Sequence, residues 1–392
     1  MMSKKSPQLR FEGFTDDWEE RKLGDLTTIS TGKLDANAMV ENGKYDFYTS
    51  GIKKYRIDVA AFEGPSITIA GNGATVGYMH LADNKFNAYQ RTYVLQEFLV
   101  DRSFIFSEIG NKLPKKIKQE ARTGNIPYIV MDMLTELKLS IPQNNSEQQK
   151  IGSFFKQLDD TIDLHQRKLD LLKEQKKGYL QKMFPKNGAK VPELRFAGFA
   201  DDWEERKLKE LFQPSKNKNN NGLYNQKDIL AASLGTELIP KRTFFGLKST
   251  KESVKNYRIV KTGDLIYTKS SIKGFPNGII RSNKGNVGIV PPLYCVYTLQ
   301  KDINSSIIQL YFEDKNRLDF YLFPLVNVGA RNNVNITDLE FLEGKVTIPK
   351  SYEEQSKIVQ FMEQLNRTID LHQRKLDLLK EQKKGFLQKM FV

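Results

Sequence analysis

Two long stretches of the chain carry apolar residues at alternating steps of three and four positions, with polar residues between them. This spacing is that of a heptad seam, and it predicts two α-helices that each pair with another helix. Asn144 and Ser351 are each followed three residues later by a glutamate, which is typical of a helix N-cap. Pro185 is expected to stop the first helix. About 40 residues at 1.5 Å each would give a rod of about 60 Å.

The two stretches are copies of one another. Residues 161–184 and 368–391 match at 23 of 24 positions, and only Tyr179 and Phe386 differ. Because a helix cannot bury a seam alone, we expect the two copies to pair antiparallel about a pseudo-two-fold axis, and their extra apolar residues to hold helices of other chains. The residues expected to pair the helices or dock partners are Ile151, Phe154, Phe155, Leu158, Ile162, Leu169, Leu172, Tyr179, Ile358, Phe361, Leu365, Ile369, Leu376, Leu379 and Phe386.

A second duplication lies near the start of each half of the chain. Residues 7–26 and 192–211, here called the start-boxes, are identical at 15 of 20 positions and both contain DDWEERKL. Each half therefore consists of a start-box, a variable middle and a long helix. The predicted domains are a first globular domain (1–143), a first long helix (144–184), a linker (185–191), a second globular domain (192–350) and a second long helix (351–392).

The two variable middles share a rhythm of secondary structure but little sequence. In both, a short β-like run leads into a Gly-rich turn, at residues 66–78 and 264–278. Short β-branched and aromatic runs separated by Gly, Asn and Pro predict an α+β fold in which each domain mixes helices with a twisted sheet. We interpret the two middles as two versions of one binding domain.

Composition and charge narrow the classes of function. The net charge of +14 favours a polyanionic partner, most often nucleic acid, although solvated lysines alone could also produce it. The single cysteine excludes an intrachain disulfide framework, and no apolar run is long enough to span a membrane. No secretory signal is recognisable, so we expect a cytoplasmic protein.

No set of residues predicts catalysis or metal binding by this chain. His165 and His372 occupy equivalent seam positions without carboxylate or cysteine companions at ligand spacing, and His80 has no Ser/Asp constellation around it. The Gly-rich stretch at 71–77 lacks the Lys-Ser/Thr of a phosphate-binding loop. We therefore expect no cofactor, no metal and no enzymatic activity in the chain itself.

The duplicated helices, the DDWEERKL boxes and the Glu-Gln-x-Lys-Ile helix starts at 147–151 and 354–358 resemble the specificity subunit of type I restriction-modification systems. The resemblance implies that the two middles are target recognition domains that each read half of an interrupted, asymmetric DNA site. It also implies that the helices set the spacing and dock two methyltransferase subunits. Those subunits would supply S-adenosylmethionine and methylate adenine N6, and restriction subunits could join them.

Because recognition domains diverge with their targets, the DNA contacts are inferred from residue chemistry rather than from the resemblance. Lysine and arginine are suited to phosphates, and asparagine amides at turns are suited to base edges. The candidates are Lys53, Lys54, Arg56, Asn72, Lys115, Lys116, Lys118, Arg122, Asn125, Lys269, Lys273, Asn277, Arg281, Lys284, Arg331 and Asn332. The alternative is a coiled-coil adaptor whose tandem domains bind proteins or glycans; its helices would look the same, but its middles would not need to be basic.

Overall fold

The computed structural model describes residues 6–120, 127–186, 188–233, 238–240, 250, 252–272, 274–325 and 336–392. The chain divides into two compact units. Unit 1 comprises Met1–Arg167 and Arg374–Val392, and unit 2 comprises Lys168–Gln373. Among the described residues, none of the helices has the length and apolar character that a membrane span requires.

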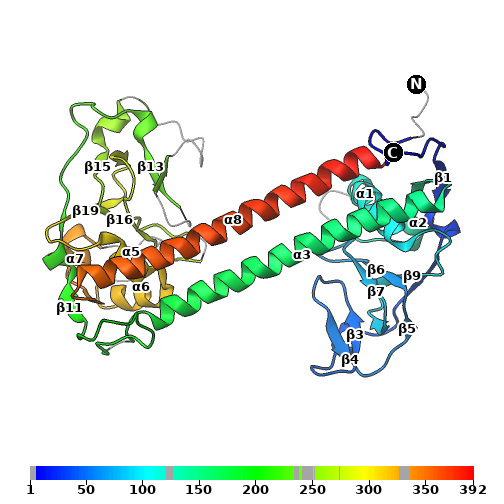
Figure 1. The fold of residues 1–392 in the computed structure, drawn as a ribbon, viewed down its shortest axis with the longest axis horizontal. Helices are drawn as coiled ribbons and strands as arrows, with labels where there is room; N and C mark the ends of the chain where they lie inside the picture. Colours follow the sequence, from blue (N-terminus) through cyan, green and yellow to red (C-terminus); the bar gives the residue numbers. More distant parts are fainter. Residues whose placement is uncertain are drawn as a thin grey trace. The chain divides into compact units, whose positions relative to one another are not determined.

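Unit 1 holds two four-stranded sheets and a separate two-stranded ribbon (Figure 1). The first sheet has the order β2-β9-β6-β7 and is antiparallel throughout, and the second has the order β4-β3-β8-β5 with β3 and β8 parallel. The strands are β1 (Glu19–Lys22), β2 (Thr28–Thr31), β3 (Tyr45–Tyr48), β4 (Tyr55–Ile57), β5 (Phe62–Glu63), β6 (Ser66–Ala70), β7 (Met79–Ala82), β8 (Lys85–Ala88), β9 (Thr92–Gln96) and β10 (Lys138–Ile141). The helices of its recognition domain are α1 (Arg102–Glu120) and α2 (Met131–Thr135), with 3-10 turns at Leu23–Asp25 and Ala36–Ala38.

The core of unit 1 lies between the first sheet and α1. Alternate residues of β6, Ile67 and Ile69, share a hydrophobic cluster with Phe104 and Ile109 of α1, as expected for a strand whose successive side chains point to opposite faces. The start-box contributes Trp18 to the same cluster. The first duplicated segment is therefore part of the core of the recognition domain.

Unit 2 repeats this architecture with different residues. Its four-stranded sheet has the order β12-β19-β16-β17, again antiparallel, and β11 pairs with β20 as β1 pairs with β10. The strands are β11 (Glu204–Lys207), β12 (Phe212–Pro214), β13 (Leu230–Ala232), β14 (Leu238–Pro240), β15 (Arg258–Val260), β16 (Leu265–Tyr267), β17 (Ile280–Ser282), β18 (Gly288–Val290), β19 (Cys295–Leu299) and β20 (Lys345–Ile348). The helices are α4 (Leu208–Leu211), α5 (Ser305–Glu313), α6 (Lys315–Leu322) and α7 (Asp338–Leu342), with 3-10 turns at Gln226–Asp228 and Ser253–Asn256.

The two units differ most in their second sheets and in the helix that follows the main sheet. Unit 2 has two-stranded pairs, β13-β14 and β15-β18, where unit 1 has a second four-stranded sheet. The single helix α1 corresponds to α5 and α6, because Asp314 leaves the helical conformation and caps the N-terminus of α6 by accepting from the N–H of Asn316 (2.9 Å). The predicted α+β fold with a repeated arrangement of sheet and helices is confirmed.

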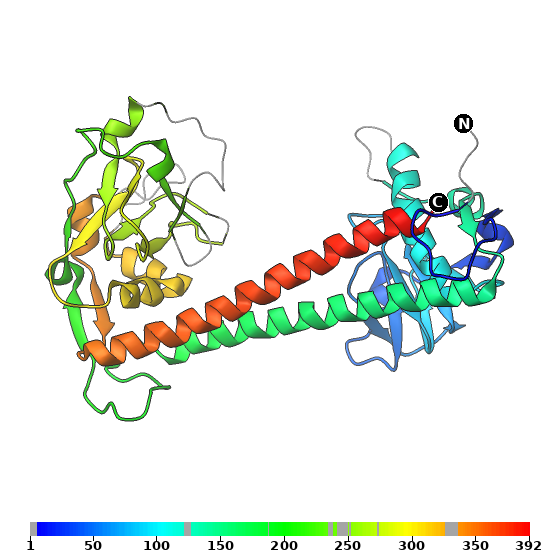
Figure 2. The ribbon, with the colours of Figure 1, turned by 45° about the horizontal axis from the view of Figure 1, so that its top comes forward.

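The long helices α3 (Asn145–Lys182) and α8 (Tyr352–Met390) each contribute to both units. In unit 1 the first part of α3 packs against the last part of α8, and in unit 2 the last part of α3 packs against the first part of α8 (Figures 1 and 2). Phe154 contacts Phe386 and Tyr179 contacts Phe361, each with ring centroids 5.0 Å apart. Since the partner number falls as the residue number rises, the pairing is antiparallel, as the seam predicted.

The start of each long helix is fastened to its start-box by a buried ion pair. Arg10 donates two hydrogen bonds to the buried Glu147 (2.6 and 2.7 Å), and Arg195 does the same to Glu354 (2.6 and 2.9 Å). Asn144 caps α3 as predicted, by accepting from the N–H of Ser146 (2.9 Å). The glutamates do not complete capping boxes, because a guanidinium offers a bidentate, charge-assisted partner instead.

Candidate nucleic-acid interface and docking helices

In unit 1, two loops that are distant in sequence are bonded to one another. The turn between β6 and β7 and the loop after β3 meet where Ser50 donates to the side chain of Asn72 and Thr75 donates to the carbonyl of Ser50. Lys53 and Lys54 extend from the same loop over the rings of Tyr55 and Tyr48, at 5.3 and 5.4 Å from the ring centroids. The structure thus brings together three predicted contacts: Lys53, Lys54 and Asn72.

The basic end of α1 lies beside the same Gly-rich turn. Gly77 has a φ of +83°, and a Cβ built on it would lie 2.7 Å from the side chain of Ile117, so the turn approaches α1 as closely as glycine permits. Lys115 and Lys118 are exposed on this helix end. Lys116 forms an ion pair with Glu120 (2.5 Å), which offsets part of its charge.

Two exposed tyrosines join this surface. The backbone of Tyr128 forms an isolated antiparallel β-bridge with that of Asn72, and Tyr78 follows the Gly-rich turn. Their exposed fractions, 59% for Tyr128 and 40% for Tyr78, are high for aromatic side chains. Neither tyrosine was among the predicted contacts, because an isolated aromatic residue in a loop gives no sequence signal that separates it from a core residue.

The side chain of Arg56 already has several partners within unit 1. Its guanidinium donates to the carbonyls of Gly43 (3.0 Å) and Lys44 (2.7 Å) and forms an ion pair with Asp46. Arg56 therefore connects β4 to β3 and to the residues just before β3. Its side chain is still partly exposed. A phosphate bound by Arg56 would share the guanidinium with these existing partners.

In unit 2, the corresponding turn between β16 and β17 is also held by its side chains. Asn277 donates to Asp319 of α6 (2.6 Å), which connects the turn to the helix that corresponds to the end of α1. Lys269 donates to the carbonyl of Ile336 (2.5 Å) and lies 3.7 Å from Asp338. Both residues are therefore at the predicted turn, and both already have intramolecular partners.

Arg281 and Lys284 occupy positions that sequence reasoning did not anticipate. Arg281 is 4% exposed, and its Nε donates to the carbonyl of Ser233 (3.2 Å). Burial lowers the pKa of this guanidinium, although Glu313 favours its charged form. This burial argues against a direct phosphate contact. Lys284 forms an ion pair with Glu363 of α8 (2.7 Å). The predicted contacts outside the described residues are Arg122, Asn125, Lys273, Arg331 and Asn332.

All the residues predicted to pair the helices are buried or half-buried. The polar interruptions of the seam have different partners in the two units. Lys383 forms an ion pair with Asp159 across the helix pair in unit 1 (2.5 Å), whereas its counterpart Lys176 forms an ion pair with the buried Glu313 of α5 in unit 2 (2.8 Å). Position 366, which corresponds to Asp159, is an asparagine, so Lys176 has no carboxylate on α8 at this place and pairs with the recognition domain instead.

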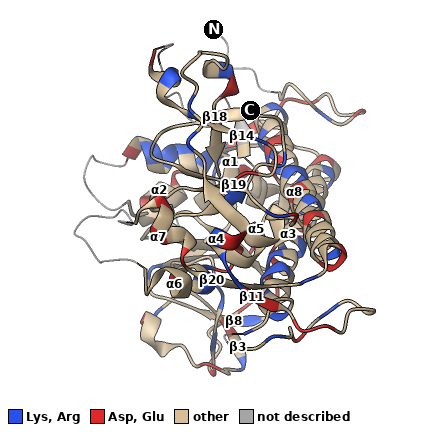
Figure 3. Cartoon of the chain, turned by 90° about the vertical axis from the view of Figure 1, so that its left-hand side faces the viewer, with Lys and Arg blue, Asp and Glu red and all other residues tan. Residues whose placement is uncertain are grey.

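Apolar side chains remain exposed at equivalent positions of the two long helices. Leu164 and Leu171 of α3 are 67% and 51% exposed, and the equivalent Leu371 and Leu378 of α8 are 64% and 53% exposed. Charges of both signs are interspersed along the same helices (Figure 3). Within the described part of the chain, no group of three or more His, Cys, Asp or Glu residues is arranged to hold a metal ion.

Known proteins resemble the chain both in sequence and in fold. The model of a family described as the type I restriction modification DNA specificity domain matches residues 15–174 and again residues 200–381. The type I restriction enzyme EcoDI specificity subunit of Escherichia coli is 34% identical over 148 residues, which are 37% of this chain and 33% of that protein. The MjaVIII specificity subunit of Methanocaldococcus jannaschii is 22% identical over 212 residues, which are 50% of this chain and 49% of that protein. These matches span between a third and a half of the relatives' lengths.

The fold has a counterpart over the full chain. The crystal structure of a type I restriction-modification system S subunit from M. genitalium superposes with a TM-score of 0.69 at 18% identity, covering 99% of both chains. At that identity the likeness shows the fold alone. The two matches to the family model, one in each half and together covering most of the sequence, establish the family. The chain belongs to the DNA specificity proteins of type I restriction-modification systems.

Proposed function

We propose that this specificity subunit reads an interrupted double-stranded DNA site, with one recognition domain on each half-site, and docks two adenine-N6 methyltransferase subunits on its long helices. The observation that carries the proposal is a repeated topology filled with unlike residues. The sheets β2-β9-β6-β7 and β12-β19-β16-β17 share one order, while the turns they present differ in sequence. One topology with two different sets of turn residues suits a DNA site whose two halves differ in sequence.

The DNA contacts of the first domain would come from the surface formed by the loop after β3, the β6–β7 turn and the end of α1. Lys53, Lys54, Lys115 and Lys118 supply charge there, and Asn72, Tyr78 and Tyr128 supply amide and aromatic groups. Such a mixture is typical of surfaces that bind phosphates and approach bases. In the second domain, Asn277 and Lys269 mark the corresponding turn. Arg281 is excluded from the proposed contacts because it is buried.

The salt dependence of binding tests the proposed DNA surface. The full chain should bind duplex DNA with a log–log slope of about −0.9 per neutralised phosphate. Replacing Lys53, Lys54 and Lys118 by Ala should reduce the magnitude of the slope by up to about 3. A matched control replaces three exposed lysines outside the surface, Lys156, Lys182 and Lys190, and should leave the slope unchanged. Equal slopes for the two triple variants would remove this surface from the proposal.

The partner subunits would cover the repeated leucines of α3 and α8. Changing Leu164 and Leu371 to Ser should weaken the complex with the cognate methyltransferase subunit, as measured by native mass spectrometry, and should not affect DNA binding by the isolated chain. S-adenosylmethionine and the methyl transfer would belong to the partner, and restriction subunits would join through it. Methyl transfer by this chain alone would contradict the proposal.

Helix length offers a separate test of the spacer. Deleting residues 167–173 and 374–380 together removes one heptad from each helix and keeps the antiparallel register. Each helix would shorten by about 10 Å, which corresponds to about three base pairs. Sequencing of methylated adenines in cells that carry the chain and its methyltransferase should return both half-sites with a shortened spacer. An unchanged spacer would refute the role of the helices, and no binding to any DNA would favour the adaptor alternative.

A further inference from the structure

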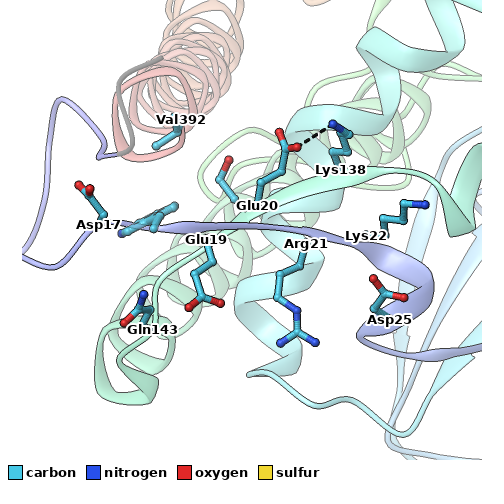
Figure 4. Close-up of a pocket in the computed structure, with 11 residues that line it drawn as sticks. Asp17, Glu19, Glu20, Arg21, Lys22, Asp25, Lys138, Gln143 and Val392 are labelled. Carbon is cyan, nitrogen blue, oxygen red and sulfur yellow. Dashed lines mark ion pairs between the residues drawn. The ribbon is translucent and has the colours of Figure 1, made fainter. Parts of the chain in front are cut away.

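Unit 1 presents four charged side chains on the outer face of its two-stranded ribbon. Glu20 of β1 pairs with Lys138 of β10 (2.7 Å), and Lys22 pairs with Glu136, the residue that ends α2 (2.6 Å). Figure 4 shows Glu20 and Lys138 facing one another on one side of β1, whereas Glu19 and Arg21 lie on the other side. We call Glu20, Lys22, Glu136 and Lys138 the first charged quartet.

Unit 2 presents the same quartet in the same register. Glu205 pairs with Lys345 (2.6 Å), and Lys207 pairs with Glu343, the residue that ends α7 (3.1 Å). Glu343 has an additional partner, Lys209 (2.8 Å), at a position where the first start-box has Gly24. The strand registers also agree, because Lys22 lies opposite Lys138 in unit 1 as Lys207 lies opposite Lys345 in unit 2. All four positions therefore carry the same residue type twice, although two of them lie in the start-boxes and two lie at the far end of the variable middles.

The fold does not require these side chains. Each quartet residue is at least 40% exposed, and ion pairs of this kind contribute only about 0–1 kcal/mol to stability. Of the two buried residues in each ribbon, Ile141 of unit 1 has the same type as Ile348 of unit 2, whereas Leu139 is replaced by Val346. An exposed pattern that is kept at the ends of variable middles whose loops differ indicates contact with something that both units meet.

DNA is a poor occupant for either quartet. Each quartet has two positive and two negative charges, so its net charge is zero and it offers phosphates no attraction. The ribbon also belongs to a different sheet from the β6–β7 and β16–β17 turns that carry the proposed DNA contacts. A neutral patch of ordered, alternating charge suits a protein surface that carries the complementary pattern. In unit 1 the ribbon borders an open hollow of about 840 Å³, lined mainly by charged side chains, which could admit such a surface.

We infer that the two charged quartets are equivalent docking sites for two copies of one protein, the methyltransferase subunit that the proposed function places on the long helices. This inference rests on that proposed function. Each ribbon strand β10 or β20 leads within four residues into the helix α3 or α8, so one subunit could contact a ribbon and the adjoining helix together. The quartets would add specificity to an apolar helix contact, because like charges that face one another across an interface are strongly unfavourable.

A charge swap separates docking from folding. The first swap variant combines Glu20→Lys with Lys138→Glu and Lys22→Glu with Glu136→Lys, which preserves both ion pairs and the net charge while reversing the pattern shown to a partner. The second swap variant makes the same changes at Glu205, Lys345, Lys207 and Glu343 in a Lys209→Ala background, because Lys209 also pairs with Glu343 (2.8 Å). Its binding is compared with that of Lys209→Ala alone. The control swaps the exposed pair Glu252 and Lys255, which lies outside both ribbons. Urea unfolding of each variant checks that the fold is retained.

Binding is measured with the full chain and its cognate methyltransferase subunit, by native mass spectrometry and titration calorimetry. We expect the wild-type chain and the control to bind two subunits. Each swap variant should bind one subunit normally and the other more than tenfold more weakly, and a chain with both swaps should bind both weakly. Unchanged affinity in folded swap variants would overturn the inference and leave common descent as the source of the identity. A wild-type chain that binds no methyltransferase subunit would instead refute the proposed function.

Discussion

Replacing Glu108 by glutamine should change the pH dependence of the stability of unit 1. The side chain of Glu108 is fully buried on α1, and one of its oxygens, Oε2, has no hydrogen-bond partner. Burial raises the pKa of its carboxyl from 4.5 to about 7, although Lys112 and the N–H of Ser140 favour the charged form. The folded chain therefore holds this proton more tightly than the unfolded chain does.

The sign and size of the effect follow from proton linkage. The contribution of Glu108 to stability is fully present below pH 4.5, declines as the pH rises and reaches its minimum above pH 7. A pKa difference of about 2.5 corresponds to about 3 kcal/mol, at about 1.36 kcal/mol per tenfold change in proton affinity. Glutamine carries no charge at any of these pH values. The stability of Glu108→Gln relative to wild type should therefore increase by about 3 kcal/mol between pH 4.5 and pH 8.

The two tryptophans allow each unit to be followed separately. Trp18 belongs to unit 1 and contacts Phe104, one turn before Glu108 on α1, with ring centroids 5.7 Å apart. Urea unfolding would be followed by Trp18 fluorescence in a Trp203→Phe background, with and without Glu108→Gln, from pH 4.5 to pH 8. Parallel stability profiles for the two proteins would refute the argument that burial controls this carboxyl.

Glu313 of unit 2 provides the matched control. Burial raises the pKa of Glu313, but Lys176 and Arg281 outweigh burial together, and the pKa lies below its ordinary value. Its charged form therefore stabilises unit 2 above pH 4.5, and this contribution is lost as the pH falls. In a Trp18→Phe background, the stability of Glu313→Gln relative to wild type should therefore fall as the pH rises through 4.5, whereas that of Glu108→Gln relative to wild type rises with pH.

The ion pairs and tryptophans of the start-boxes give two further predictions. Arg10→Ala or Arg195→Ala should lower the free energy of unfolding by about 3–5 kcal/mol, because each leaves a buried glutamate without its partner. Arg10→Lys should recover only part of the loss. Equal stability of Arg10→Ala and wild type in urea would contradict this prediction. Trp203→Phe should cost about 1 kcal/mol more than Trp18→Phe, since Nε1 of Trp203 donates to Glu354 (3.2 Å) while Nε1 of Trp18 has no partner; differential scanning calorimetry of the two variants would measure it.

The parts of the structure that depend on periodicity could be predicted from the sequence. The heptad spacing defined both long helices and their antiparallel pairing, and the repeated β-run with a Gly-rich turn identified β6–β7 and β16–β17 as equivalent hairpins. These features are local, because a helix seam or a strand-turn-strand unit is specified by a few neighbouring residues.

The roles of individual charged residues could not be predicted in the same way. Glu147 stands at a capping-box position, but its partner Arg10 lies 137 positions away in the sequence, and only the fold brings them together. Arg281 looked like a surface residue in a stretch rich in Lys, Ser and Asn, yet β17 directs it into the interior beside Glu313. Spacing along the chain carries little information about such tertiary pairs.

The paired fastenings of Arg10 to Glu147 and Arg195 to Glu354 also bear on how new variants of this protein could arise. Each variable middle follows a start-box and precedes a long helix, and in both units the start-box and the helix are joined by the same arginine–glutamate ion pair. After a genetic crossover within a start-box or a helix, the start-box arginine and the helix glutamate would still be able to form this ion pair. The variable middles could therefore be exchanged as whole units, so that recombination would produce a new combination of recognition domains while keeping both ion pairs.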